Sequence, residues 1–128
     1  MATEIAEATV TCNWAPYQVE GKLADGRCFY FKARSTRILL GVGSTPAEAV
    51  AASCGFDWVY AGDAGNPAGE CWIGSPDAPR IPFEGGILVR RDAPEDEPDP
   101  SGWADRLPER VLQDYLKWMV AEALEDYP

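Results

Sequence analysis

Residues 27–55 read RCFYFKARSTRILLGVGSTPAEAVAASCG, and the hydrophobic period changes within them. Residues 27–33 are rich in aromatic side chains, which favours a β-strand. Residues 38–42, ILLGV, form a continuous apolar run of the kind found in strands covered on both faces. This part of the chain therefore predicts two consecutive strands, the second of them inside a sheet.

A short helix is predicted directly after these strands, at about 46–54. Thr45 and Glu48 have the spacing of a capping box, Pro46 stands at the first helical position, and Gly55 can end the helix in a left-handed conformation. The expected core-facing stripe has helical spacing and consists of Ala47, Val50, Ala51 and Cys54.

The remaining strand signals lie on either side of this segment. Residues 8–14 alternate between apolar and polar side chains, as do residues 17–23, and Asp25-Gly26 supplies a hairpin turn after them. Residues 87–91, ILVRR, follow a pair of glycines and predict a further strand. Four to six strands are expected, in a mostly antiparallel sheet.

The C-terminal third combines a loop with a long helix. Residues 92–102 carry five acids and three prolines without a large apolar side chain, which predicts a linker or exposed loop. An amphipathic helix is expected at about 106–126, with Asp105 as its cap. The prediction is one α+β domain, residues 1–128, in which the long helix covers the sheet face that the short helix leaves open.

Charge is distributed unevenly along the chain. The net charge is −10, and residues 92–128 contain eleven acidic and three basic side chains. Nucleic acids and anionic membranes require clusters of Lys and Arg, so neither is expected as a direct ligand. A second protein with a basic surface is the expected partner. The alternative is that the acidic segment only keeps the protein in solution.

Enzymatic chemistry has little support in the sequence. There is no histidine, and the four cysteines (Cys12, Cys28, Cys54 and Cys71) show no Cys-x-x-Cys spacing, so no metal, cofactor or catalytic residue is predicted. Reduced and mostly buried thiols are expected. A binder of small ligands or an enzyme remains a third hypothesis. It would use the strand–helix turn at Gly43, Ser44 and Thr45, or the loop carboxylates Asp57, Asp63, Glu70 and Asp77.

Tryptophans near the loops are candidate anchors for a partner. Trp58, Trp72 and Trp103 lie in or beside loops, and Trp103 directly follows the acidic segment. Core packing is the alternative for each of them. The predicted partner-binding set combines the acidic residues with this anchor and consists of Asp92, Glu95, Asp96, Glu97, Asp99, Trp103, Asp105 and Glu109.

Residues 27–55 resemble the strand–strand–helix core of HicB-type antitoxins and of small uncharacterised phage proteins, through a strand that ends in Gly-x-Thr and a helix that begins with Pro and Glu-Ala. The resemblance implies an accessory protein of a phage or mobile element that binds another protein.

One hypothesis is an inhibitor that occupies the basic groove of a host nucleic-acid enzyme, as a DNA mimic does. Another is an antitoxin-like protein that binds through a sheet edge or the C-terminal helix.

Location and assembly are predicted only in outline. The N-terminal residues lack the pattern of a secretory signal, and no apolar run is long enough to span a bilayer. A cytoplasmic protein is therefore expected, and a homodimer is left open.

Overall fold

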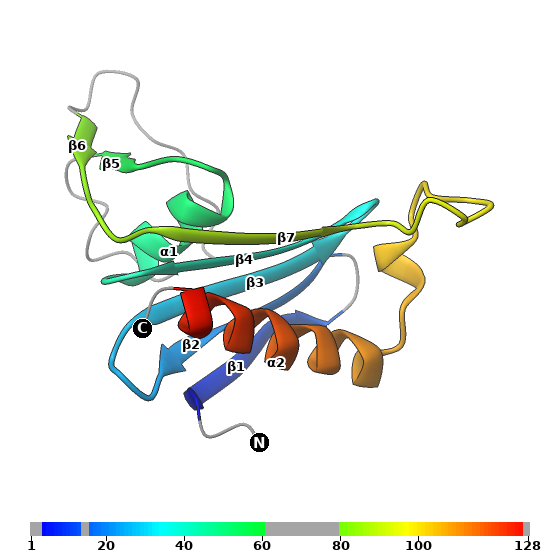
Figure 1. The fold of residues 1–128 in the computed structure, drawn as a ribbon, viewed down its shortest axis with the longest axis horizontal. Helices are drawn as coiled ribbons and strands as arrows, with labels where there is room; N and C mark the ends of the chain where they lie inside the picture. The colour runs from blue at the N-terminus through cyan, green and yellow to red at the C-terminus, as the bar shows by residue number, and fades with distance from the viewer. Residues whose placement is uncertain (1–3, 14–15, 61–79, 127–128) are drawn as a thin grey trace.

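A five-stranded antiparallel sheet forms the body of the protein (Figure 1). The computed structural model describes residues 4–13, 16–60 and 80–126. The strand order is β1-β2-β3-β4-β7, which places the predicted interior strand β4 between two neighbours. The strands are β1 (Ile5–Asn13), β2 (Tyr17–Leu23), β3 (Cys28–Arg34), β4 (Arg37–Gly43) and β7 (Ile87–Asp92).

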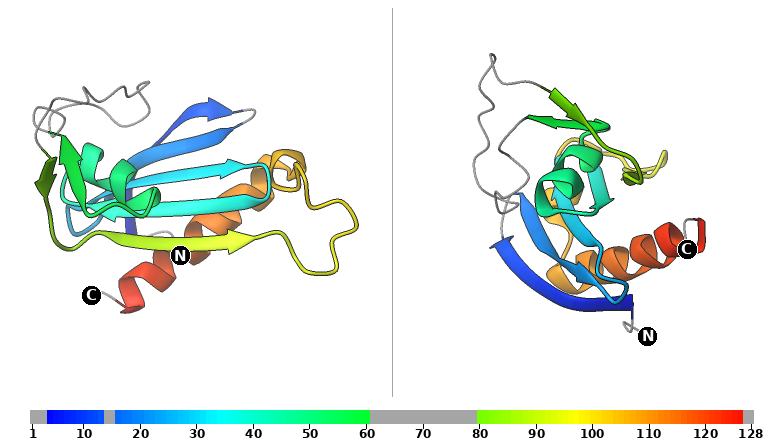
Figure 2. Two further views of the ribbon diagram at one scale, coloured as in Figure 1. Left: turned by 90° about the horizontal axis from the view of Figure 1, so that it is seen from above. Right: turned by 90° about the vertical axis from the view of Figure 1, so that its left-hand side faces the viewer.

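Two helices lie on opposite faces of this sheet (Figure 2). They are α1 (Pro46–Ser53) and α2 (Glu109–Asp126), while β5 (Trp58–Tyr60) and β6 (Arg80–Pro82) form a separate small ribbon. The α+β prediction, with one helix on each face of an antiparallel sheet, is confirmed. No helix among the described residues is long and apolar enough to cross a membrane.

The β2–β3 hairpin turns at the predicted Asp25-Gly26 pair. Gly26 has a φ of +92°, which a residue with a side chain rarely adopts. The Asp25 carboxylate accepts hydrogen bonds from the backbone N–H and the Nε of Arg27, and these bonds hold the pKa of Asp25 below its usual value. The turn therefore fixes the register in which Val19 lies opposite Phe31.

The main core lies between the sheet and α2. Side chains from β2, β3, β4 and β7 meet the inner side of α2, and the largest fully buried side chains include Phe29, Phe31, Leu40 and Met119. Helix α2 crosses the sheet from β2 to β7. At its start the Tyr17 hydroxyl of β2 donates a hydrogen bond to Glu109, and near its end Glu122 forms an ion pair with Arg91 of β7.

The opposite face receives α1 at very short range. A Cβ added at Gly41 would lie 2.0 Å from the carbonyl oxygen of Ala49, so only glycine permits this approach. The Thr45 cap is confirmed, because Thr45 Oγ1 accepts the Glu48 N–H at 3.1 Å, whereas the Glu48 carboxylate accepts the N–H of Ser44 in place of the Thr45 N–H expected for a capping box. The predicted apolar stripe of α1 is wrong: its buried residues are Ala49, Ala52 and Ser53, whereas Cys54 is exposed. Because α1 lies so close to Gly41 and Gly43 of β4, small side chains face the sheet in place of the most apolar ones.

Some predictions fall outside the described residues. These concern Trp14, Cys71, Trp72 and the carboxylates Asp63, Glu70 and Asp77. The C-terminal helix begins at Glu109 instead of 106, since Ala104–Arg106 forms a separate 3₁₀ turn. Asp105 lies in that turn.

Candidate partner-binding surface

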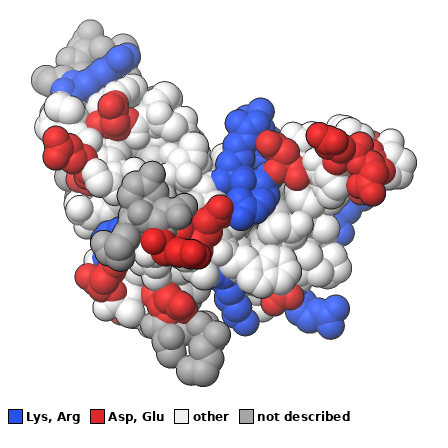
Figure 3. Space-filling view, in the orientation of Figure 1, with Lys and Arg blue, Asp and Glu red and all other residues white. Residues whose placement is uncertain are grey.

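The acidic segment, residues 92–102, projects from the end of β7 and returns to the body at Trp103 (Figure 1). Backbone hydrogen bonds tie both of its ends to the β3–β4 turn, from Ala93 N–H to the Thr36 carbonyl and from Ala104 N–H to the Ser35 carbonyl. Acidic side chains gather over this projection (Figure 3). The segment is thus a loop anchored at both ends.

Arginines pair with three of the five acids in residues 92–102. Asp92 lies 3.1 Å from Arg90 and 3.6 Å from Arg37. Arg106 approaches Glu97 and Asp99, at 3.8 and 3.7 Å, and also donates to backbone carbonyls of the loop at Asp99 and Ser101. These acids therefore help to shape the loop and are partly neutralised.

Glu95 and Asp96 are the two acids at the tip of the loop. Both are exposed, and neither has an ion pair within the part of the chain that the structure describes. Because their charges are uncompensated, these two carboxylates are the residues of the predicted acidic set most available to a basic partner.

The predicted contacts at Asp105 and Glu109 have structural roles. Asp105 Oδ1 accepts the backbone N–H of Ser35 at 3.1 Å, and Ser35 has an uncommon positive φ of 57°. Asp105 therefore stabilises the β3–β4 turn and is not the cap of the long helix. Glu109 accepts a hydrogen bond from Tyr17 at 3.1 Å, which connects the start of α2 to β2.

Trp103 is a core residue, and its prediction as a surface anchor is corrected. Only 7% of the residue is exposed, and it belongs to the cluster between the sheet and α2. The loop folds back onto the β3–β4 turn and thereby inserts the indole beneath the helix. Its ring meets Tyr115 edge to face, at 6.1 Å between centroids.

An exposed tryptophan lies on the outer side of α2 instead. Trp118 is 60% exposed, the most of any large hydrophobic residue among those described, and its ring meets Tyr115 at 5.5 Å. Trp103, Tyr115 and Trp118 thus form a continuous row of rings from the core to the surface. Trp118 was not predicted as a surface residue, although the sequence contains the signal: it is a large aromatic residue outside the apolar stripe of the helix.

The turn at Gly43, Ser44 and Thr45 does not present a free anion site. The Glu48 carboxylate accepts the Ser44 N–H at 3.4 Å, and Thr45 accepts the N–H of Glu48. A Cβ at Gly43 would clash with Glu48 at 2.7 Å. The backbone N–H groups of Ser44 and Glu48, which a bound phosphate would need, are thus already hydrogen-bonded. Gly43 is required for the close packing of α1.

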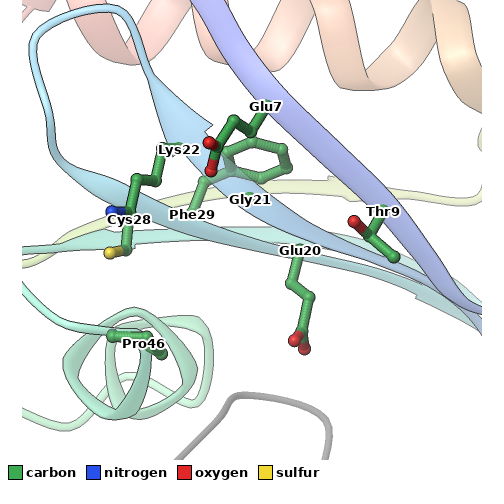
Figure 4. Close-up of a pocket in the computed structure, with 8 residues that line it drawn as sticks. All are labelled: Glu7, Thr9, Glu20, Gly21, Lys22, Cys28, Phe29 and Pro46. Atoms are coloured by element: carbon green, nitrogen blue, oxygen red, sulfur yellow. The ribbon is translucent and has the colours of Figure 1, made fainter.

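A shallow hollow of about 220 Å³ lies between the β1–β2 edge and the start of α1 (Figure 4). Burial raises the pKa of the Cys28 thiol, which does not favour a nucleophilic thiolate at neutral pH. Among the residues that the structure describes, no group of three or more potential ligands could hold a metal ion. The lining residues are Glu7, Thr9, Glu20, Gly21, Lys22, Cys28, Phe29 and Pro46.

The two remaining sequence candidates lie elsewhere. Asp57 is exposed, and Trp58 stacks on Phe56 at 4.9 Å with the guanidinium of Arg80 4.3 Å from the indole centroid. These rings belong to the β5–β6 ribbon and its approach, separate from the acidic segment.

Comparison of the chain with known proteins adds no relative. No model of a known family, no curated protein and no solved structure matches it.

Proposed function

We propose that this protein is a protein-binding module that engages a basic partner through the acidic loop tip and the exposed face of α2. The observation that carries the proposal is the row of rings that connects Trp118 to Trp103, the residue at which the acidic loop ends. An exposed indole that packs against a neighbouring aromatic ring is a typical hot spot of protein interfaces. Carboxylates beside it add charge complementarity and orientation.

The surroundings of Trp118 support a basic partner. Asp114 and Glu122 lie four residues before and after it on the helix, so they share its side of α2. Glu122 is already paired with Arg91, whereas Asp114 has no ion pair among the described residues. A partner surface with Lys and Arg around an apolar pocket would match this arrangement. A host enzyme that binds nucleic acid, inhibited at its basic groove, is the partner class we propose.

A bait series tests this proposal. Wild-type protein, Glu95→Gln/Asp96→Asn and a control, Asp57→Asn/Glu84→Gln, are immobilised and exposed to lysate of the source organism, and bound proteins are eluted in rising salt. Both doubles remove two exposed charges, but Asp57 and Glu84 adjoin the β5–β6 ribbon, away from the loop. One partner should elute from the Glu95→Gln/Asp96→Asn bait at a lower salt concentration than from wild type. From the control bait it should elute at the same salt concentration as from wild type. Equal elution from all three baits would refute the acidic contact.

A second candidate is an accessory protein that binds by strand addition at β1. This strand has nine residues, is exposed along most of its length, and among the described strands pairs with β2 alone. An open edge of this kind can accept an extended segment of a partner. Lysine on an edge strand opposes such pairing, so Val10→Lys should abolish binding. In this mode the partner should elute from the Glu95→Gln/Asp96→Asn bait at the same salt concentration as from wild type. Retention of the partner by Val10→Lys would rule out this mode.

A further inference from the structure

Helix α1 covers only part of its sheet face. It lies over the end of β3 and β4 that contains Gly41 and Gly43, and Figure 2 shows no helix over the opposite end, toward the β3–β4 turn. Leu39 is two residues from Gly41 and therefore points to the same face. Among the described residues no helix covers this part of the face, which is called the uncovered half-face below.

The strand register places basic side chains on the uncovered half-face. Lys32 lies opposite Leu39, and Leu39 lies opposite Arg90, so the three form one row across β3, β4 and β7. The next row consists of Arg34, Arg37 and Asp92. Four cations and one carboxylate thus share a small area of a protein whose net charge is −10.

The charges on this half-face are not balanced internally. Arg37 and Arg90, with side chains 52% and 46% exposed, both approach the single carboxylate of Asp92. Lys32 and Arg34 have no ion pair among the residues that the structure describes. Arg34 stands directly opposite Arg37, an arrangement of like charges that weakens a strand pair. A ligand that brings negative charge would relieve this repulsion.

We propose that this half-face is a docking site for a short acidic peptide segment of a partner protein. Leu39 lies between Lys32 and Arg90, and the 43% exposed Leu88 lies on the same face in the adjoining row, opposite Gly41, so both leucines can give the segment apolar contacts. Three strands and two rows span only about 10 by 7 Å between backbone positions, which suits a few carboxylates. A nucleic acid strand would extend past this area toward the acidic loop and meet repulsion there.

This site is separate from the surface of the proposed function. The acidic loop tip and Trp118 would bind basic groups, whereas the half-face would bind acidic ones. The two proposals can therefore be refuted independently. Failure to bind the acidic peptide would not change the elution of the basic partner in rising salt, and absence of that partner would not change binding of the peptide.

Fluorescence anisotropy with a defined probe tests the proposal. The probe is a rhodamine-labelled peptide of four glutamates and two leucines, and its glutamine counterpart is the control peptide. The protein variants are Lys32→Gln/Arg34→Gln and, as a matched control, Arg110→Gln/Lys117→Gln on α2, where both cations are exposed. The half-face variant should bind the acidic probe at least tenfold more weakly, and the α2 variant within twofold of wild type.

Arg34→Glu separates binding from folding. Because it replaces a like-charge pair by an opposite one, its midpoint of thermal unfolding should be equal to or higher than that of wild type, while its affinity for the acidic probe falls by more than tenfold. Three results would overturn the proposal: no saturable binding of the acidic probe at low salt, equal losses in the two double variants, or tighter binding of a single-stranded oligonucleotide of equal charge.

Discussion

The two faces of the sheet are built differently. The face beneath α2 is apolar from β2 to β7, and its central residues, such as Phe31 and Leu40, are fully buried. The other face holds α1 through glycines on one half and carries cations on the other half. One face therefore supplies most of the core, whereas half of the other face remains accessible to solvent.

Within the sheet, the largest expected effect separates two adjacent leucines of β4. Leu40 points into the α2 core and is fully buried, whereas Leu39 points to the opposite face and is half-buried. Leu40→Ala should lower the free energy of unfolding by about 2–5 kcal/mol, because it removes buried methyl groups and leaves a cavity. Leu39→Ala should lose less than half as much in the same urea titration. Equal losses would show that both faces contribute alike.

Gly41→Ala tests the close packing of α1. The added methyl group would overlap the Ala49 carbonyl and approach Ser53 Cβ at 2.8 Å, so the helix must move away. We expect a loss of about 1–3 kcal/mol, typical of overpacking. Ser44→Ala, at the exposed residue of the same turn, serves as a control in urea unfolding. Unchanged stability of Gly41→Ala would contradict the contact.

Alkaline unfolding tests the burial of Tyr30 on the α1 face. Burial raises the pKa of Tyr30 to about 12, with smaller contributions from Cys54, Glu20 and Cys12. The folded state thus favours the neutral phenol, and the resulting stability is present below pH 10 and is lost as the pH rises toward 12. Tyr30→Phe should flatten the fall in stability over this range, measured by urea titrations at several pH values. An identical fall in both proteins would disprove the assignment.

The smallest expected effect is a gain in stability. Arg34→Glu converts the Arg34–Arg37 pair at the end of the β3–β4 hairpin into an opposite-charge pair. Such cross-strand pairs contribute about 0.2–1 kcal/mol. A rise in the urea midpoint that disappears in 0.5 M salt would confirm the electrostatic origin. A fall in the midpoint would mean that Arg34 has a favourable contact that outweighs the repulsion.

Local signals predicted the secondary structure well. The Asp25-Gly26 turn and the side-chain cap of Thr45 depend on residues close in sequence, and both form as expected. The stripe of α1 could not be derived in this way, because its buried side is chosen by the glycines of β4. Periodicity identifies a helix, but the surface beneath it decides which side chains fit.

The candidate sites were harder to predict because they depend on tertiary contacts. The acidity of the 92–102 segment was evident, but the pairing of Arg106 with Glu97 and Asp99 was not. Trp103 adjoins a polar loop in sequence and is nevertheless buried. The basic half-face is invisible without the register, since Lys32 and Arg90 are 58 residues apart and lie in one row.

The most direct test of the account compares the two tryptophans at the ends of the ring row. Trp118→Ser should change the free energy of unfolding by less than about 1 kcal/mol and sharply reduce recovery of the partner that releases from the wild-type bait with salt. Trp103→Ser should lose about 3–5 kcal/mol, as large core truncations do. Undiminished recovery by folded Trp118→Ser would contradict the proposed binding surface.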